Sequence, residues 1–355
     1  MSVDNIRVGL IGAGANTRLR HIPGLQGQDG VEITAVANRT RQSSELAAKE
    51  FDIPVVYGDW LELIEDDSID AVCIGTWPNM HAPVTVAALE SDKHVLVEAR
   101  MAMDSSEAHE MLETSVANPH LVAQIVPAPH TLAIDATVIE LISSGYIGDL
   151  ISVRLHNTAA GGFPDNERPI HWRDERVLSG NNAMQMGIWY EALMRWVGPA
   201  SSVQAVAQTI VKHRRDTYGR RFAISIPDHL EIICEMVAGG TANLTVSSVS
   251  GLVPEIDIWL VGSEGTLHLQ SDKESKSTDR GIRILGGRRD NETLTEIAVP
   301  DDKRGGWRVE EEFINAIRGT ENVTHTEFAD GVKYMEFTDA VTRAWQSGGK
   351  VNLPL

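Results

Sequence analysis

The chain has 355 residues, which suggests two domains, because a single hydrophobic core seldom grows to that size. Hydrophobic residues form 42% of the sequence and charged residues 23%, proportions typical of a globular protein. The formal net charge of −19 repels polyanions, which argues against nucleic acid or an anionic membrane surface as a partner. The sequence shows no signal peptide and no apolar run of ~18 residues, so we expect a cytoplasmic protein with no membrane span.

Residues 1–126 alternate short apolar runs with amphipathic stretches. Strands are predicted at residues 6–12, 32–38, 71–75, 94–98 and 121–126. Helical patterns such as 43–51 and 82–91 lie between them. Alternation of strand and helix at this spacing predicts a parallel sheet with helices on both faces, so residues 1–126 should form a Rossmann-type domain.

The pattern changes in the second predicted domain, residues 127–355. One helix is predicted at 136–145 and a closing helix at 328–348. Longer strand-like runs are predicted at residues 150–158, 229–237, 241–250, 255–262 and 265–270. Glycine-rich turns join them, so the fold class is α/β, with a large, mostly antiparallel open sheet in the second domain.

The segment GLIGAGANT follows the first predicted strand and opens the first helix. Gly12 and Gly14 supply the tight turn and the close backbone approach that a pyrophosphate requires. Ala15, Asn16 and Thr17 begin the helix, whose free N–H groups favour an anion, although Thr17 stands where Gly or Ala is usual. The turn therefore predicts a dinucleotide cofactor.

The second predicted strand ends in Asn38, Arg39 and Thr40 rather than in an acidic residue. A carboxylate there would bind the adenine ribose of NAD and repel a 2′-phosphate, whereas Arg39 can bind that phosphate through its guanidinium. We therefore expect NADP as cofactor, with NAD still possible. The alternative is that Arg39 is a solvated loop residue.

Three segments together resemble the glucose–fructose oxidoreductase / inositol dehydrogenase (Gfo/Idh/MocA) family. They are GLIGAGANTRLRHIPGL, GTWPNMHAPVTVAALESDKHVLVEAR and SGNNAMQMGIWYEALMRWVGP. The resemblance covers nearly the whole chain. It implies an NAD(P)-dependent oxidoreductase of a small-molecule sugar, polyol or related hydroxy compound, and a homodimer or homotetramer formed through the C-terminal sheet.

The second segment carries further cofactor-binding candidates. Ligands gather at the carboxyl ends of parallel strands, and the family's loop after the third of the predicted strands lies beside the nicotinamide ribose. The candidates there are Thr76, Trp77, Asn79 and His81. For His81 the alternative is a residue that only starts a helix. Glu98, at the end of the next strand, is expected to have a structural or ribose-facing role.

The resemblance fails at the residues that carry proton transfer. Ala99 stands at the position of the family's lysine, and Gln185, Trp189 and Ala192 stand at those of its Asp, His and second Asp. Oxidation of an alcohol still needs a group that takes the hydroxyl proton. The catalytic candidates are Arg100, which could bind a carboxylate or pair with Glu98, and His171, Tyr190 and Glu191 as proton-transfer groups. No set of residues has convincing metal-ligand spacing.

Three functions are compatible with these features. The leading hypothesis is an oxidoreductase with a rearranged site, acting on a sugar-like, possibly anionic, hydroxy compound. The second is an enzyme that holds its cofactor tightly and uses it only transiently, with no net redox change. The third is a catalytically silent nucleotide-binding sensor or regulator, since fold alone does not decide function.

Overall fold

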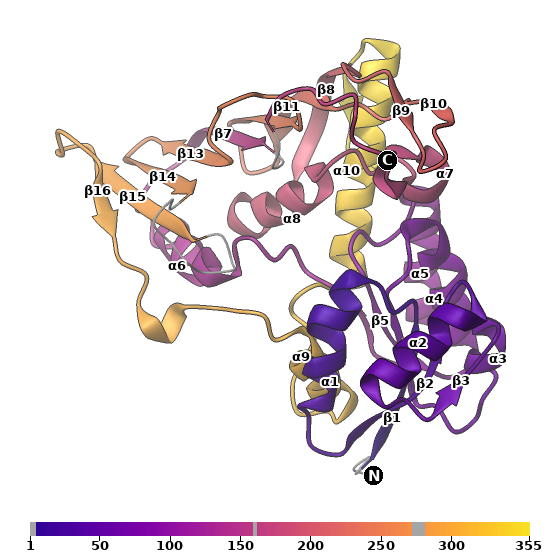
Figure 1. Cartoon of the computed structure of the whole chain (residues 1–355). Helices are drawn as coiled ribbons and strands as arrows, with labels where there is room; N and C mark the ends of the chain where they lie inside the picture. The colour runs from indigo at the N-terminus through magenta and orange to yellow at the C-terminus, as the bar shows by residue number, and fades with distance from the viewer. Residues whose placement is uncertain (1–4, 159–161, 272–280) are drawn as a thin grey trace. The chain divides into compact units, whose positions relative to one another are not determined.

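The structure is a computed structural model that describes residues 5–158, 162–271 and 281–355 (Figure 1). The chain divides into two compact units, Met1–Pro127 with Arg308–Met335, and Ala128–Trp307 with Glu336–Leu355. The second unit therefore differs from the predicted domain 127–355. Residues 308–335 return to the first unit, where Tyr334 Oη accepts a hydrogen bond of 2.7 Å from the backbone N–H of Met101.

Within its described residues, the first unit contains a six-stranded sheet in the order β3-β2-β1-β4-β5-β6. All five neighbouring pairs are parallel, which confirms the predicted Rossmann sheet. The strands are β1 (Ile6–Ile11), β2 (Val31–Ala37), β3 (Val55–Val56), β4 (Ala71–Ile74), β5 (His94–Val97) and β6 (Ala123–Ile125). The α-helices are α1 (Ile22–Gln26), α2 (Arg41–Phe51), α3 (Trp60–Ile64), α4 (His81–Glu90), α5 (Ser105–Ala117) and α9 (Val309–Ile317).

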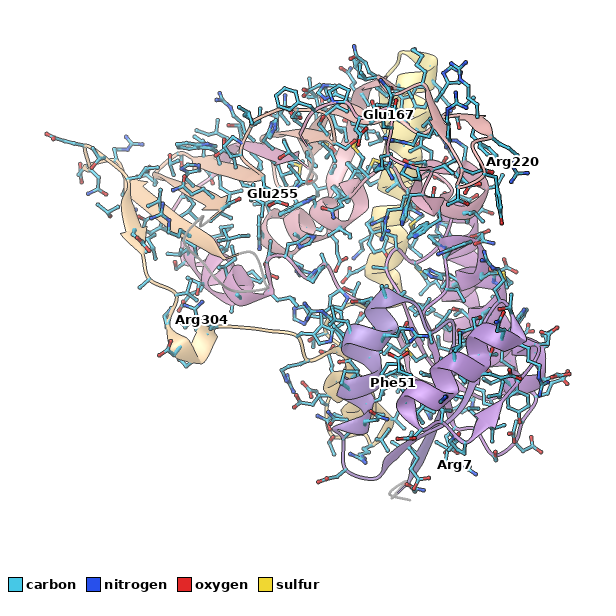
Figure 2. All side chains as sticks on the ribbon, in the orientation of Figure 1. Arg7, Phe51, Glu167, Arg220, Glu255 and Arg304 are labelled. Atoms are coloured by element: carbon cyan, nitrogen blue, oxygen red, sulfur yellow. The ribbon has the colours of Figure 1, made fainter. Side chains whose placement is uncertain are left out.

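Local sequence explains where these elements begin. Thr40, Asp59 and Asp104 each accept a backbone N–H with the side chain and so cap α2, α3 and α5. All four residues of β4 are buried, as expected for a parallel strand covered on both faces. Arg7, on β1 and labelled in Figure 2, donates two hydrogen bonds to the Asp70 carboxylate just before β4. The distance between Nη2 and Oδ1 is 2.7 Å.

The second unit is built on a nine-stranded sheet, as far as its residues are described, in the order β16-β15-β14-β13-β7-β12-β11-β8-β17. Strands β7 and β12 pair in parallel, and the other neighbours are antiparallel, as predicted. The strands are β7 (Leu150–Thr158), β8 (Ala200–Gln208), β11 (His229–Met236), β12 (Thr241–Ser247), β13 (Ile256–Gly262), β14 (Gly265–Ser271), β15 (Ile282–Arg288), β16 (Thr295–Ile297) and β17 (Val351–Asn352). The predicted dimer or tetramer through this sheet stays a prediction.

Helices and one small hairpin complete the second unit. The α-helices are α6 (Leu132–Ser143), α7 (Arg176–Ser179) and α8 (Met186–Val197). Of the long helix α10 (Phe328–Ser347), the residues from Glu336 onward belong to the second unit, where Phe337 stacks on Tyr190 of α8 with ring centroids 3.7 Å apart. Strands β9 (His213–Arg215) and β10 (Arg221–Ala223) form a separate antiparallel hairpin that the sequence analysis does not predict. Among the described residues, no helix combines the length and apolar character needed to cross a bilayer.

The turn after β1 and the end of β4 approach each other so closely that neither glycine there can carry a side chain. A Cβ built on Gly75 would lie 2.0 Å from Thr17 Oγ1 and 2.3 Å from the carbonyl oxygen of Gly12. Gly12 has φ +89°, and its Cβ would lie 2.8 Å from the backbone nitrogen of Thr76. The dinucleotide turn therefore depends on Gly75 as well as on Gly12.

We predict that Gly75→Ala destabilises the first unit by about 1–3 kcal/mol, because the new methyl group overlaps backbone that cannot move freely. Chemical denaturation followed by tryptophan fluorescence measures the change. Gly58→Ala is the control, since the nearest atom to a Cβ there is Arg41 Nη1 at 3.9 Å. Equal stability of the two variants would contradict the close-approach account.

Candidate functional site

The side chain of Asn38, the residue after β2, stabilises the turn after β1 by hydrogen bonding. Its Oδ1 accepts the backbone N–H of Ala13 at 2.6 Å, and its Nδ2 donates to the carbonyl of Ser43 at 2.9 Å. Asn38 therefore shapes the turn with the same amide that was predicted to contact the cofactor. Thr40 likewise serves the fold, because its Oγ1 caps α2 by accepting the N–H of Ser43.

Free N–H groups follow the glycine turn. Gly14 N–H donates to the Gly12 carbonyl at 2.9 Å. In the described part of the chain, the N–H groups of Ala15, Asn16 and Thr17 have no hydrogen-bond acceptor. The helical run 15–26 begins here and includes a π-helical turn at Thr17–His21 before α1. Three unpaired donors at a helix start suit a phosphate group.

Arg39 is exposed, and its guanidinium lies over the ring of Trp77, 5.0 Å from the centroid. A cation at that distance is attracted to the indole face. This contact fixes where the guanidinium sits beside the ends of β2 and β4. Arg39 is thus an exposed loop residue in contact with Trp77, and its binding of a 2′-phosphate stays a prediction.

The segment after β4 contains buried polar atoms without partners. Thr76 Oγ1 and Asn79 Oδ1 are both shielded from water and hydrogen-bonded to nothing in the described residues. An unsatisfied buried polar atom costs free energy, so such atoms mark places where a bound molecule can supply the missing hydrogen bond. Together with the free N–H groups, they show that the residues at this edge of the sheet fit a dinucleotide.

The buried side chain of His81 contacts the backbone of this segment. Its Nδ1 lies 2.8 Å from the carbonyl oxygen of Arg100, and its Nε2 lies 3.2 Å from that of Thr76. Burial lowers the pKa of His81, which outweighs the opposite effect of the carbonyls, so the ring is neutral at neutral pH. His81 is the first residue of α4 and contacts both the loop after β4 and the end of β5, and its contact with the cofactor stays a prediction.

A buried polar cluster lies at the end of β5. His21 is 0% exposed, and its two ring nitrogens face two carboxylates. Nδ1 lies 2.5 Å from Glu310 Oε1, and Nε2 lies 3.0 Å from Glu98 Oε1. Asn16 also donates to Glu98, and the N–H of Ala99 donates to Glu98 Oε2 at 3.0 Å. Glu98 therefore has the structural role that was one of its two expected roles.

This cluster carries a charge in the interior. Burial by itself lowers the pKa of His21, but the hydrogen bonds to Glu310 and Glu98 outweigh it and raise the pKa to about 9. Burial favours a raised pKa for Glu98, but its bonds to His21 hold that pKa below the usual range. Only the imidazolium can donate from both nitrogens at once, so His21 is a cation between two acceptors at neutral pH.

The end of β5 has no lysine. Ala99 contributes only a methyl group, and Arg100 is 4% exposed, although its side chain was predicted to meet an anionic ligand. That role for Arg100 stays a prediction. Neither His21 nor Glu310 was predicted as a site residue from the sequence. For His21 the available signal was its place in HIPGL, in the same segment as the glycine turn.

Two of the three predicted proton-transfer residues are engaged inside the second unit. Tyr190 is 1% exposed, and its Oη accepts the backbone N–H of Ala200 at 2.8 Å. Burial raises its pKa well above the usual range. Glu191 accepts the N–H of Ala128 at 3.1 Å and pairs with Arg195 at 2.8 Å. These contacts give Tyr190 and Glu191 structural roles within the second unit. They do not support proton transfer by either residue.

His171 differs from them because its side chain is exposed. It begins the short 3₁₀ helix Trp172–Asp174, where its Nδ1 accepts the N–H of Arg173 at 3.3 Å. Burial of part of the ring and the nearby Arg173 lower its pKa. A histidine with lowered pKa and an accessible ring remains compatible with proton transfer.

Helix α8 carries the other departures from the family pattern. Trp189 is 0% exposed, and its ring stacks on His130 with centroids 5.4 Å apart. Trp189 Nε1 and Gln185 Oε1 have no hydrogen-bond partner among the described residues. They stand one helical turn apart, so the helix retains buried polar atoms where the resemblance aligns the family's His and Asp. Across the described ranges, no three His, Cys, Asp or Glu side chains form a potential metal site.

Comparison with known proteins agrees with the fold and the turn. The model of an oxidoreductase family with an NAD-binding Rossmann fold (Gfo/Idh/MocA) matches residues 6–124, and the C-terminal domain model of the same family matches residues 136–268. The chain therefore belongs to the Gfo/Idh/MocA family of NAD-binding oxidoreductases.

Individual relatives are distant. Trans-1,2-dihydrobenzene-1,2-diol dehydrogenase of Bos taurus is 24% identical over 264 residues, which cover 74% of this chain and 72% of that protein. Levoglucosan dehydrogenase of Pseudarthrobacter phenanthrenivorans is 27% identical over 184 residues, covering 50% and 46%. A solved structure of levoglucosan dehydrogenase with NADH and L-sorbose has a TM-score of 0.84 and 19% identity, covering 99% of both chains.

We predict that the first unit loses stability as pH rises through about 9, the pKa of His21 in the folded state. The unfolded pKa is lower, at 6.5, so the contribution is complete below that pH and is lost above about 9. It amounts to roughly 3 kcal/mol, since one pKa unit corresponds to about 1.4 kcal/mol. The free energy of unfolding, measured by denaturant titration from about pH 6 to about pH 10, should fall accordingly.

His21→Gln should be less stable at neutral pH and should lose most of this pH dependence. His120→Gln is the control, because His120 is 61% exposed in its side chain and pairs only with the exposed Asp92. A wild-type profile that has the same slope as His21→Gln would show that the buried imidazolium does not stabilise the fold.

Proposed function

We propose that this protein is an NADP-dependent oxidoreductase of a sugar, polyol or related hydroxy compound. The carrying observation is the exposed Arg39 guanidinium held over Trp77, beside a strand end that has no carboxylate. A guanidinium matches the geometry of two phosphate oxygens. An acidic residue at this strand end would repel the phosphate. Two of the relatives are named for hydroxy compounds, a dihydrobenzenediol and levoglucosan.

The residues of the first unit divide the binding of such a cofactor between them. The free N–H groups of Ala15, Asn16 and Thr17 would hold the pyrophosphate, and Arg39 the 2′-phosphate. Thr76 Oγ1 and Asn79 Oδ1 would offer polar contacts beyond the pyrophosphate. A bound nicotinamide supplies or accepts the hydride.

Proton transfer requires a group other than the family's lysine and histidine, because Ala99 and Trp189 occupy those positions. His171 is our candidate, since it is exposed and its lowered pKa keeps the ring neutral and able to accept a proton near neutral pH. Its geometry within the short 3₁₀ helix leaves Nε2 without a partner among the described residues.

We predict that the protein oxidises at least one member of a panel of sugars, polyols and cyclic diols with NADP⁺, with the absorbance of the reduced cofactor as readout. His171→Gln should lower kcat about 100-fold or more and leave the Kd of NADPH unchanged, because general base catalysis contributes about 10²–10⁴-fold. His120→Gln is the control. Loss of nucleotide binding in His171→Gln, or full activity in it, would contradict the role given to His171.

We predict that Arg39→Ala weakens NADPH binding about tenfold or more and leaves NADH binding within about twofold, since one charge-assisted hydrogen bond contributes about 1.5–3 kcal/mol. Fluorescence titration of the purified, nucleotide-stripped protein measures both constants. Arg41→Ala, a nearby exposed arginine paired with Glu45, is the matched control. An equal loss for NADH and NADPH would mean that Arg39 only supports the loop.

A further inference from the structure

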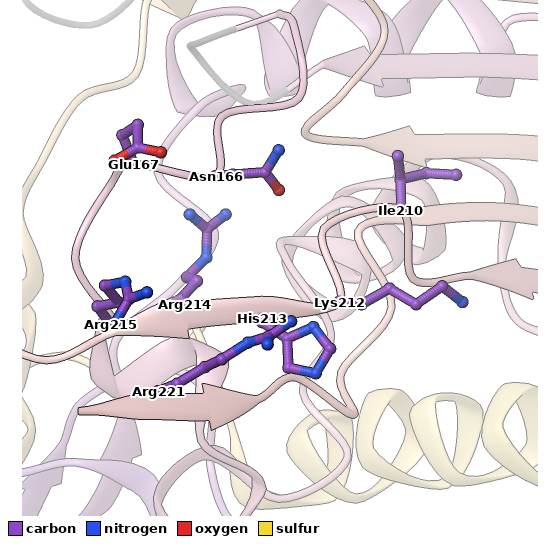
Figure 3. Close-up of a pocket in the computed structure, with 8 residues that line it drawn as sticks. All are labelled: Asn166, Glu167, Ile210, Lys212, His213, Arg214, Arg215 and Arg221. Carbon is purple, nitrogen blue, oxygen red and sulfur yellow. The ribbon is translucent and has the colours of Figure 1, made fainter. Parts of the chain in front are cut away.

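The β9–β10 hairpin of the second unit borders a cavity of about 370 Å³ (Figure 3). Its lining is basic in a chain whose formal net charge is −19. The cationic residues around it are Lys212, Arg214, Arg215 and Arg221, and His213 lies among them. Glu167 is the carboxylate that lines the same cavity.

The hairpin places like charges opposite each other. In the register of the two strands Arg215 pairs with Arg221, and like charges directly across a strand pair destabilise it. Arg215 donates to the Gly219 carbonyl at 2.8 Å, which does not neutralise it. Lys212 and Arg221 form no ion pair within the described residues. An anion beside Arg215 and Arg221 would reduce their repulsion.

Arg214 provides a second, independent observation. It is 7% exposed, and its Nη1 donates to the carbonyl oxygens of Asp165 and Arg168 at 2.8 and 3.3 Å. Its Nε has no hydrogen-bond partner, and the nearest carboxylate oxygen is that of Asp174 at 3.5 Å. The buried guanidinium is thus held beside the cavity by two backbone carbonyls and by an ion pair with Asp174.

Neighbouring carboxylates already have other partners. Asp174 pairs with Arg168 at 2.8 Å, and Asp228 accepts the N–H groups of Ile210 and Val211 at 2.7 and 2.8 Å. Among the described residues, the lining holds the cationic side chains of Lys212, Arg214, Arg215 and Arg221 and a single carboxylate, that of Glu167. Positive charge therefore remains in excess at the cavity.

We propose that this cavity binds the phosphate group of a small ligand. Several guanidinium groups around a compact volume suit the oxygens of a phosphate, to which they can donate charge-assisted hydrogen bonds. The acidic charge of the whole chain disfavours a polyanion such as nucleic acid, and the cavity size suits a phosphate or a phosphorylated metabolite of sugar size. The site is distinct in its residues from the nucleotide site and does not depend on the function proposed above.

The test is isothermal titration calorimetry with inorganic phosphate and, separately, with a hexose 6-phosphate. Both titrations use protein saturated with NADPH, so that the nucleotide site is filled. We expect saturable binding of at least one probe. Tighter binding of the hexose phosphate would identify a metabolite as the ligand, whereas equal or tighter binding of inorganic phosphate would identify the free ion.

Arg221→Gln and Lys212→Gln should each weaken that binding about tenfold, as expected for loss of one charged donor. The matched control is Arg220→Gln, because Arg220 belongs to the same hairpin and pairs with Asp216 at 2.6 Å. Thermal unfolding confirms that each variant is folded. No saturable binding of either probe, or an equal loss in Arg220→Gln, would overturn the proposal.

Discussion

The first unit depends on a buried imidazolium. His21 follows the glycine turn, Glu98 directly follows β5, and Glu310 lies in α9 near the other end of the chain, so one ring joins three distant segments. Removing a partner from such a cluster would leave an uncompensated buried charge, which is strongly unfavourable. The cluster therefore fixes the turn relative to the end of β5, the edge at which a dinucleotide binds.

The same cluster explains how the nucleotide edge persists although the lysine is absent. Asn16 and the N–H of Ala99 complete the hydrogen bonding of Glu98, so position 99 contributes backbone, and its side chain is dispensable for the structure. Binding and proton transfer are therefore separate properties of this site. Nucleotide-binding features are intact in the first unit, whereas the side chain at position 99 offers no group for proton transfer.

Much of the fold could be predicted because local sequence determines it. Runs of Val, Ile and Ala predict the buried parallel strands, and Gly12 with Gly14 predicts the turn. The contact between His21 and Glu310 joins residues 289 positions apart, and no local pattern reports it. The contacts of Tyr190 and Glu191 could not be predicted from local sequence either, because their partners Phe337 and Ala128 are far from them along the chain. Arg39 was predicted to bind a 2′-phosphate from its charge alone. Its contact with Trp77 is known only from the structure.

The most direct test of the account is a crystal structure of the NADPH complex. The account predicts that the pyrophosphate accepts the N–H groups at Ala15–Thr17, that the 2′-phosphate contacts Arg39, and that Thr76 or Asn79 gains a partner. It also predicts that His21 remains between Glu98 and Glu310. A 2′-phosphate that points into solvent away from Arg39, or a nucleotide bound elsewhere than the turn, would contradict it.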